Sequence, residues 1–267
     1  MVTNHGKEAA IAKVLEQELG VKVEVIADFN TDSLGTFSGE IERPDSQLIT
    51  AKLKAELAFK TSQAEIAIAS EGSFNSHPHA FFISADVELI YWIDRKYNIE
   101  CIGQYTTTET NFNRISFQTK QEALAFAAQI GFPSHGLIVS CLVNKKQSFV
   151  KGIQTEKALN EAIDWALKNE QATIETDMRA HLNPTRMKAI EKAAYHLATQ
   201  LQSVCPQCAF PAFQITRKEP GLPCSNCLFP TRLVKTNVYE CKHCFYQERR
   251  STTDALADPM YCDNCNP

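Results

Sequence analysis

Four copies of one short motif decide the fold of the end of the chain: Cys205-Pro-Gln-Cys208, Cys224-Ser-Asn-Cys227, Cys241-Lys-His-Cys244 and Cys262-Asp-Asn-Cys265. Two residues between paired cysteines let a tight turn aim both sulfurs at one ion, and tetrahedral Zn²⁺ takes four thiolates at about 2.3 Å. The motifs therefore predict two four-cysteine zinc sites. Four thiolates leave no open position for water, so we expect both zinc ions to be structural.

The spacing of the motifs favours pairing the first with the second and the third with the fourth. Fifteen residues separate Cys208 from Cys224 and seventeen separate Cys244 from Cys262, both within the roughly 15–20 residues of a zinc ribbon. A cross-braced pairing of the same ligands is the alternative. A disulfide framework would need an oxidising compartment, but the chain opens without an apolar signal segment. We therefore expect a cytoplasmic protein.

Length and composition indicate two parts. The 267 residues, 44% of them hydrophobic, suit an α/β domain over 1–203 followed by a zinc-ribbon module over 204–267. No apolar run approaches the ~18 residues of a membrane helix. The two remaining thiols, Cys101 and Cys141, lie in apolar runs and are expected to be buried in the core rather than reactive.

The charge of the module argues against nucleic acid as a partner. The whole chain has a net charge of −4, and the segment from Leu201 carries seven Lys/Arg and six Asp/Glu. Each Zn²⁺ with four thiolates adds negative charge, so the metal-loaded module is acidic. Because binding to nucleic acid depends on neutralising phosphates, this composition disfavours it without excluding it.

Hydrophobic periodicity in the first 200 residues alternates between helices and strands, which predicts an α/β fold with a mixed β-sheet and flanking helices. We expect helices over 6–19, from Pro44 onward, over 119–130, over 155–169 and over 184–202. We expect strands over 21–26, 66–69, 80–83, 87–93, 99–102, 137–143 and 172–176. In the second helix, Ile49, Leu53 and Leu57 recur at helical spacing.

The most polar stretch of the chain runs from Glu175 to Arg186, between the last expected strand of this domain and its last helix. The first turn of a helix points backbone N–H groups at an anion, and arginine adds paired donors. We therefore interpret Arg179 and Arg186 as phosphate-binding residues and Asp177 or His181 as a general base. The alternative is a local Asp177–Arg179 ion pair, with His181 packing at the helix mouth.

Loops elsewhere carry matching chemistry. Asn4-His-Gly-Lys7 opens the first helix, so Asn4 and Lys7 are candidates for binding a phosphate. Glu40 and Glu71 lie in loops rich in glycine and hydroxyl side chains, each following an expected strand, and could hold Mg²⁺. Taken singly, each loop also fits an ordinary surface turn.

These residues suggest relatives at two levels. Nearly the whole chain resembles an uncharacterised bacterial family of unknown function with a C-terminal zinc ribbon that has two four-cysteine sites, through the segments 31–40, 69–74, 176–187, 221–224 and 262–267. More distantly, residues 1–200 resemble the house-cleaning pyrophosphatases that remove inosine and xanthosine triphosphates. Their Asn-x-x-Lys matches Asn4 to Lys7, their helical Lys-Ala matches Lys54-Ala, and their acidic-Ser-Gly loop matches Glu71-Gly-Ser. Their Ser-His-Arg is matched only in part, by His181 and Arg186.

Two functions follow as hypotheses. The first is a Mg²⁺-dependent phosphohydrolase for a nucleotide or other phosphorylated small molecule, in which Glu71, Asp177 and His181 are catalytic. The second is a non-catalytic protein whose zinc ribbon contacts a protein or structured RNA. Catalysis requires Lys7, Glu71, Asp177 and His181 to meet at one site. The sequence does not decide whether the chain is an enzyme, what its substrate is or what its oligomeric state is.

Overall fold

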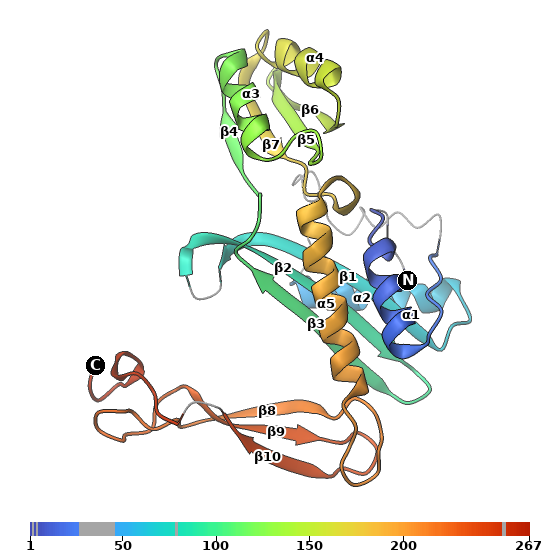
Figure 1. The fold of residues 1–267 in the computed structure, drawn as a ribbon, viewed down its shortest axis with the longest axis vertical. Coiled ribbons are helices and arrows are strands. Elements are labelled where there is room, and N and C mark those ends of the chain that lie inside the picture. The colour runs from blue at the N-terminus through green and yellow to red at the C-terminus, as the bar shows by residue number, and fades with distance from the viewer. Residues whose placement is uncertain (2, 4, 27–45, 78–79, 253–254) are drawn as a thin grey trace. The chain divides into compact units, whose positions relative to one another are not determined.

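The computed structural model describes the chain except for residues 2, 4, 27–45, 78–79 and 253–254 (Figure 1). It divides into two compact units, one of Met1–Asp94 with Ile102–Ala198 and the other of Arg95–Cys101 with Thr199–Pro267. Its strands form three sheets. The predicted α/β class with a C-terminal module is confirmed, although the strands are spread over three sheets instead of one.

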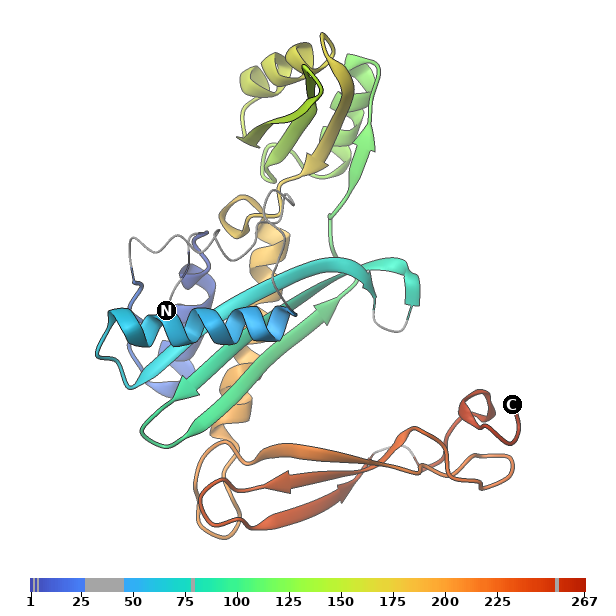
Figure 2. The same ribbon diagram turned by 180° about the vertical axis from the view of Figure 1, so that it is seen from behind.

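The first unit contains most of a three-stranded sheet in the order β1 (Ile66–His77), β2 (Ala80–Asp94) and β3 (Ile99–Thr107), and the first residues of β3 belong to the second unit. Helix α2 (Gln47–Thr61) covers one face, while α1 (Glu8–Leu19) and α5 (Pro184–Gln202) cover the other (Figures 1 and 2). Strands β1 and β2 pair antiparallel from Ile66↔Asp94 onward. The two strands predicted over 80–83 and 87–93 are therefore parts of one long strand.

Helix α2 does not bury the face that its periodicity predicts. Its buried residues are small or polar: Thr50, Ala51, Lys54, Ala55 and Ala58. Ile49 and Leu53, whose spacing indicated the helix, are exposed. Alanines let the helix lie close to the sheet, where they pack against alanine, leucine and tyrosine side chains of β1 and β2.

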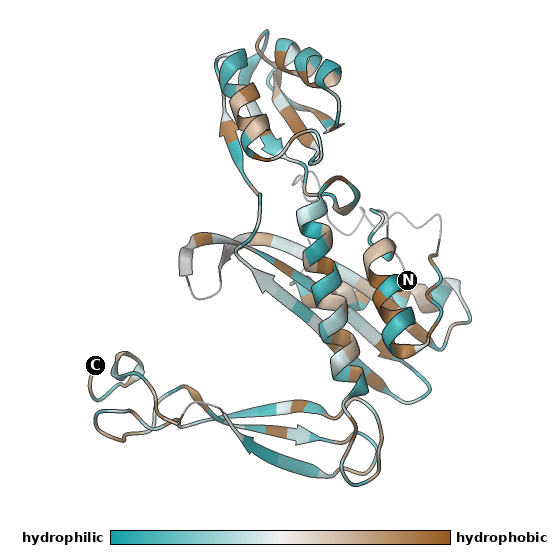
Figure 3. Ribbon diagram, in the orientation of Figure 1, coloured by the Kyte–Doolittle hydropathy of each residue, from teal (hydrophilic) through white to brown (hydrophobic). Residues whose placement is uncertain are grey.

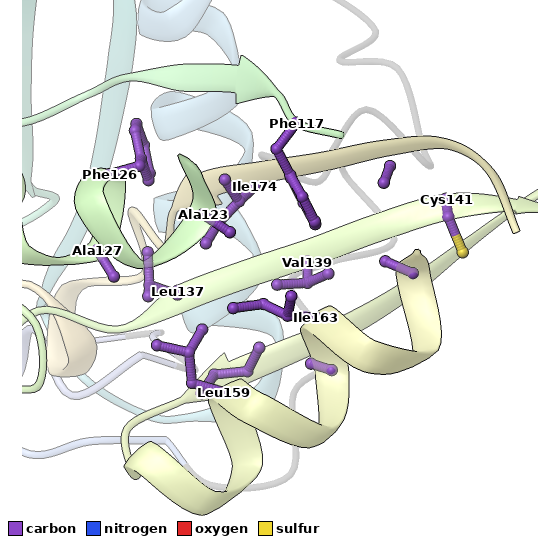
Figure 4. Close-up of a cluster of buried hydrophobic side chains, with 14 of the residues drawn as sticks. Phe117, Ala123, Phe126, Ala127, Leu137, Val139, Cys141, Leu159, Ile163 and Ile174 are labelled. Atoms are coloured by element: carbon purple, nitrogen blue, oxygen red, sulfur yellow. The ribbon is translucent and has the colours of Figure 1, made fainter. Parts of the chain in front are cut away.

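A second, four-stranded sheet lies in the same unit, in the order β4 (Arg114–Ser116), β7 (Glu170–Thr176), β5 (Leu137–Val143) and β6 (Lys146–Ile153). Helices α3 (Lys120–Gln129) and α4 (Glu156–Ala166) pack on it around an apolar core (Figure 4). The predicted capping box of Thr119 and Glu122 is present. Leu137–Val143 is an interior strand, as predicted, and Cys141 is fully buried in it.

Two other local predictions change. Residues 21–26 form no strand, and only Ile26 makes a bridge, by donating its N–H to the Met1 carbonyl. The predicted helix start at Pro44 lies outside the described residues, and the described helix begins at Gln47 with Ser46 as its N-cap. The short helix η2 (Ala180–Leu182) precedes α5, whose first turn Asn183 caps by accepting the Arg186 N–H at 3.0 Å.

The second unit is built on a sheet of β10 (Gln247–Ser251), β9 (Val234–Glu240) and β8 (Gln214–Pro220), in that order and antiparallel. Its strands are largely hydrophilic, β10 along its whole length (Figure 3). The apolar core is small and includes two cysteines: Cys205, Phe213 and Cys241. The sequence did not predict this sheet, because its strands lack the apolar alternation that marks a half-buried strand.

Candidate functional site

The eight motif cysteines form two groups of four thiols. The first group contains Cys205, Cys208, Cys241 and Cys244, and the second contains Cys224, Cys227, Cys262 and Cys265. Within each group all sulfurs lie within 4.8 Å of one another. The first motif therefore pairs with the third and the second with the fourth. The predicted pairing of neighbouring motifs was wrong, and the cross-braced alternative is correct.

The antiparallel sheet explains the interleaved pairing. Strand β8 lies between the first and second motifs, and β9 lies between the second and third. A seven-residue strand spans about 23 Å, so β8 carries the chain away from the first group and β9 carries it back. Counting residues between motifs does not reveal this, because the same number of residues can form a loop or a strand.

Both thiol groups have the dimensions of a zinc site. The sulfur pairs Cys205–Cys244, Cys208–Cys241 and Cys227–Cys262 are 3.6 Å apart, and Cys224–Cys265 is 3.9 Å apart. A tetrahedron of thiolates about 2.3 Å from Zn²⁺ has edges of about 3.8 Å. Two four-thiolate sites suited to zinc are thus part of the structure.

Three of the four motifs share one backbone turn. In each, the first cysteine donates its N–H to the carbonyl of an aromatic residue five positions later and accepts the N–H of the residue four positions later. That fourth residue has a left-handed backbone: Ala209, Leu228 and Phe245 have φ of 58°, 58° and 60°. The repeated turn places both sulfurs on one side of the chain, as a shared metal requires.

A second concentration of chemical groups lies in the first unit. Six charged side chains from five segments are buried near the middle of the β1–β2 pair. We call these residues the ionic cluster: Lys7, Lys54, Glu71, Asp86, Glu88 and Arg186. Side chains alternate between the two faces of a sheet. The register Gly72↔Glu88 and Phe74↔Asp86 therefore puts both of these carboxylates on one face, and Glu71 on the other.

Arg186 and Glu88 form the most buried ion pair among the described residues. The Arg186 Nε donates to Glu88 Oε1 at 2.6 Å, with side-chain exposures of 0% and 1%. A second guanidinium nitrogen donates to the Met178 carbonyl, and the guanidinium carbon lies 5.0 Å from the centre of the Phe74 ring. Glycine is required at position 72, because a Cβ there would lie 2.4 Å from both Arg186 Nη2 and Glu88 Oε1.

On the other face, Lys54 of α2 forms an ion pair with Glu71. The Gln47 amide donates to the backbone carbonyls of Glu71 and Val87, both at 2.8 Å, and so ties the start of α2 to both strands. Lys7, at the start of α1, donates to the Ser70 carbonyl at 3.2 Å. The N-terminal loop, α2 and β1 are therefore joined at the ionic cluster.

Two members of the cluster titrate near neutral pH. Burial, together with the nearby charge of Glu88, raises the pKa of Asp86 to about 8. Burial, together with the positive charge of Arg186, lowers the pKa of Lys7 to about 8. An acid and a base whose pKa values are drawn towards each other are typical of a site for proton transfer.

The polar residues of the loop before α5 lie in two different surroundings. Asp177, fully buried, accepts hydrogen bonds from the Gly152 N–H at 3.1 Å and from the Arg179 backbone and guanidinium. This is the local ion pair named above as the alternative. His181 instead lies beside the N-terminal loop: its ring stacks on His5 with centroids 5.8 Å apart, and its N–H donates to the His5 carbonyl.

Of the residues predicted for a site, Lys7, Glu71 and Arg186 belong to the ionic cluster, and His181 stacks on His5, two residues before Lys7. The four residues that catalysis was expected to bring together, Lys7, Glu71, Asp177 and His181, do not all meet. Asp177 and Arg179 pair with each other. Asn4 and Glu40 lie outside the described residues. Sequence reasoning missed Asp86 and Glu88, although two acids spaced by two residues within an apolar strand would both face the same side of a sheet.

The family described as "Domain of unknown function (DUF6671)" matches residues 54–267. The chain matches no curated protein and no solved structure. In the part of the chain that the structure describes, no helix combines the length and apolar character needed to cross a membrane.

Proposed function

The chain belongs to the DUF6671 family of domains of unknown function, and we propose that it is a hydrolase for a nucleotide or other phosphorylated small molecule, with the ionic cluster as its catalytic centre. The observation that carries this proposal is that charged residues far apart in the sequence are buried around one part of the β1–β2 pair. Lys7, Lys54, Glu71 and Arg186 come from four separate segments and are buried around the same part of the β1–β2 pair, with Lys54 and Glu71 on one face and Arg186 on the other. The first three stand in the short motifs on which the resemblance to nucleoside-triphosphate pyrophosphatases, expected from the sequence, rests.

The cost of burying these groups supports a functional role. A buried ion pair is often no more stabilising than apolar side chains of the same size, so six buried charges are poorly explained by stability alone. Clusters with strongly perturbed pKa values are concentrated at functional sites. In the proposed reaction Lys7 holds a phosphate oxygen. Mg²⁺, when bound, would polarise a phosphoryl oxygen and lower the pKa of the attacking water.

The proposal changes two roles expected from the sequence. Arg186 is assigned to positioning Glu88, because its Nε donates to that carboxylate and a second nitrogen donates to the Met178 carbonyl. Asp177 orders the loop before α5, since both of its oxygens accept hydrogen bonds. His181, which is exposed beside His5, remains a candidate for contact with the ligand.

Thermal shift and product release test the proposal. Zinc-loaded full-length protein is mixed with nucleoside mono-, di- and triphosphates and with pyrophosphate, with and without Mg²⁺. We expect a ligand of this class to raise the melting temperature and to release phosphate or pyrophosphate. Lys7→Met should abolish both effects. The control is Lys13→Met, which removes an exposed lysine of α1 that pairs with Glu191 of α5. This variant should keep both the thermal shift and the product release. No shift with any phosphorylated compound would contradict the proposal.

A specific observation also favours a binding role for the zinc-containing unit. Large apolar side chains next to the second group of four thiols are at least half exposed: Leu228 67%, Phe229 52%, Met260 61% and Tyr261 50%. Exposed apolar patches mark contacts with other proteins. The second candidate function is therefore that of a zinc-ribbon binding module. Phe229→Ser with Met260→Ser should abolish partner binding while leaving two zinc ions per chain, and hydrolysis should be unchanged.

A further inference from the structure

Three oxygen atoms on one face of the β1–β2 sheet accept no hydrogen bond from a nitrogen or hydroxyl group of the described residues. They are Asp86 Oδ1, Glu88 Oε2 and Ser70 Oγ. The residues that carry them are 1%, 1% and 7% exposed. The two carboxyls among them hydrogen-bond to each other, so they share a proton when no cation is bound. Ser70 lies two residues before Gly72, and Gly72 is paired with Glu88, so the hydroxyl and both carboxylates face the same side of the sheet.

The neighbouring cations do not satisfy these atoms. Arg186 donates Nε to the other oxygen of Glu88, and Lys7 donates to the Ser70 carbonyl rather than to its hydroxyl. Leaving a buried acceptor without a partner costs about 1–3 kcal/mol, and more for a charged group. Three acceptors on one patch that no nitrogen or hydroxyl group of the described residues satisfies indicate a ligand that takes electron pairs from oxygen.

We infer that Asp86, Glu88 and Ser70 form a binding site for one hydrated divalent cation, Mg²⁺ or Mn²⁺, separate from the two four-cysteine sites. The donor set is all oxygen, which suits these hard ions rather than Zn²⁺. It is also small, and Mg²⁺ usually keeps several waters while binding through one or two carboxylates. The site differs from the Glu40 and Glu71 expected from the sequence, because Glu71 already pairs with Lys54.

The surrounding charges set how the site behaves. Lys7 and Arg186 lie close enough to influence Asp86, and both repel a cation. The ion alone should therefore bind weakly, and an anionic ligand should strengthen its binding by offsetting that positive charge. The identity of that anion, a phosphorylated compound, rests on the proposed function. Binding of the cation alone is independent of the proposed function and is measured without substrate.

Mn²⁺ is the probe, added to zinc-loaded full-length protein, with free Mn²⁺ measured by electron paramagnetic resonance. We expect one Mn²⁺ per chain, displaced by excess Mg²⁺. Asp86→Asn should weaken binding at least tenfold, because it removes a charged ligand and keeps the side chain's shape. Ser70→Ala should weaken it less. The matched control is Glu175→Gln, which removes a carboxylate half-buried on the other sheet of this unit and should leave binding unchanged.

Asp86→Asn is chosen over changes at Glu88, which would leave the buried Arg186 guanidinium without its carboxylate. Circular dichroism and a zinc content of two per chain confirm that each variant is folded. Equal Mn²⁺ binding by the parent and Asp86→Asn proteins would overturn the inference, as would the absence of saturable binding. Mn²⁺ binding without hydrolysis of any phosphorylated compound would instead refute only the proposed function.

Discussion

The interleaved zinc pairing makes a prediction that counts ions. Replacing two ligands of one site destroys that site alone, whereas replacing one ligand of each destroys both. Cys205→Ser with Cys241→Ser removes two thiolates from the same group, so we expect one zinc per chain. Cys205→Ser with Cys224→Ser removes one thiolate from each group, so we expect none. Pairing of neighbouring motifs would reverse the two results.

The size of the effect follows from the geometry. Sulfur–sulfur distances of 3.6–3.9 Å match a closed four-thiolate tetrahedron, and such sites bind Zn²⁺ with apparent free energies of about 10–16 kcal/mol. A site with missing ligands keeps far too little affinity to survive gel filtration. Inductively coupled plasma mass spectrometry of the filtered protein gives the count. One zinc in the Cys205/Cys224 double variant, and none in the Cys205/Cys241 variant, would refute the pairing.

Three further predictions concern the first unit. Gly72→Ala should lower the free energy of unfolding by about 3–5 kcal/mol, because its Cβ would push apart the buried Arg186–Glu88 ion pair. The control is Gly20→Ala, whose Cβ meets nothing within 4 Å and which should cost about 1 kcal/mol. Urea denaturation measures both changes. Arg179→Ala leaves its buried aspartate partner without the guanidinium and should cost about 1.5–3 kcal/mol; a change below about 0.5 kcal/mol, on the order expected at the surface, would show that the pair is not structural. Because the pKa of Asp86 is raised and that of Lys7 is lowered, each to about 8, their joint contribution to stability should fall from about pH 4 to 8 and rise from about pH 8 to 10. Without added divalent cation, Asp86→Asn should flatten the acid limb; an unchanged limb would count against the raised pKa.

The metal ligands could be predicted from the sequence because a Cys-x-x-Cys turn is local: its two intervening residues determine where both sulfurs point. The pairing of the turns could not, since it depends on β8 and β9. Those strands are polar, with most of their residues only partly buried, so apolar periodicity gives no sign of them. The helix start at Thr119 could be predicted because its signal is also local: the capping box lies within four residues.

The ionic cluster was only partly predictable for a different reason. Lys7 and Glu71 stand next to glycines in loop-like sequence and attract notice, whereas Asp86 and Glu88 lie in a strand, where a charged residue normally indicates the solvent side. The face of β2 that carries them is covered by helices instead. The buried face of helix α2 could not be predicted for a related reason: apolar periodicity marks its large side chains, but close approach to the sheet requires its alanines.

The two units differ in what they bury: the first buries charged side chains, and the second has only a small apolar core. In the first, apolar cores on both sheets provide the stability that offsets the cost of dehydrating six charges, which supports a function for the cluster. In the second, the core is small, and a unit of this size needs its metals to fold. Zinc bound at the two thiol groups would supply that stability, so that side chains such as Phe229 and Met260 would not be required inside. Their exposure beside a thiolate site is then a property of the surface, available for contact with another protein, and removing them should leave the fold intact.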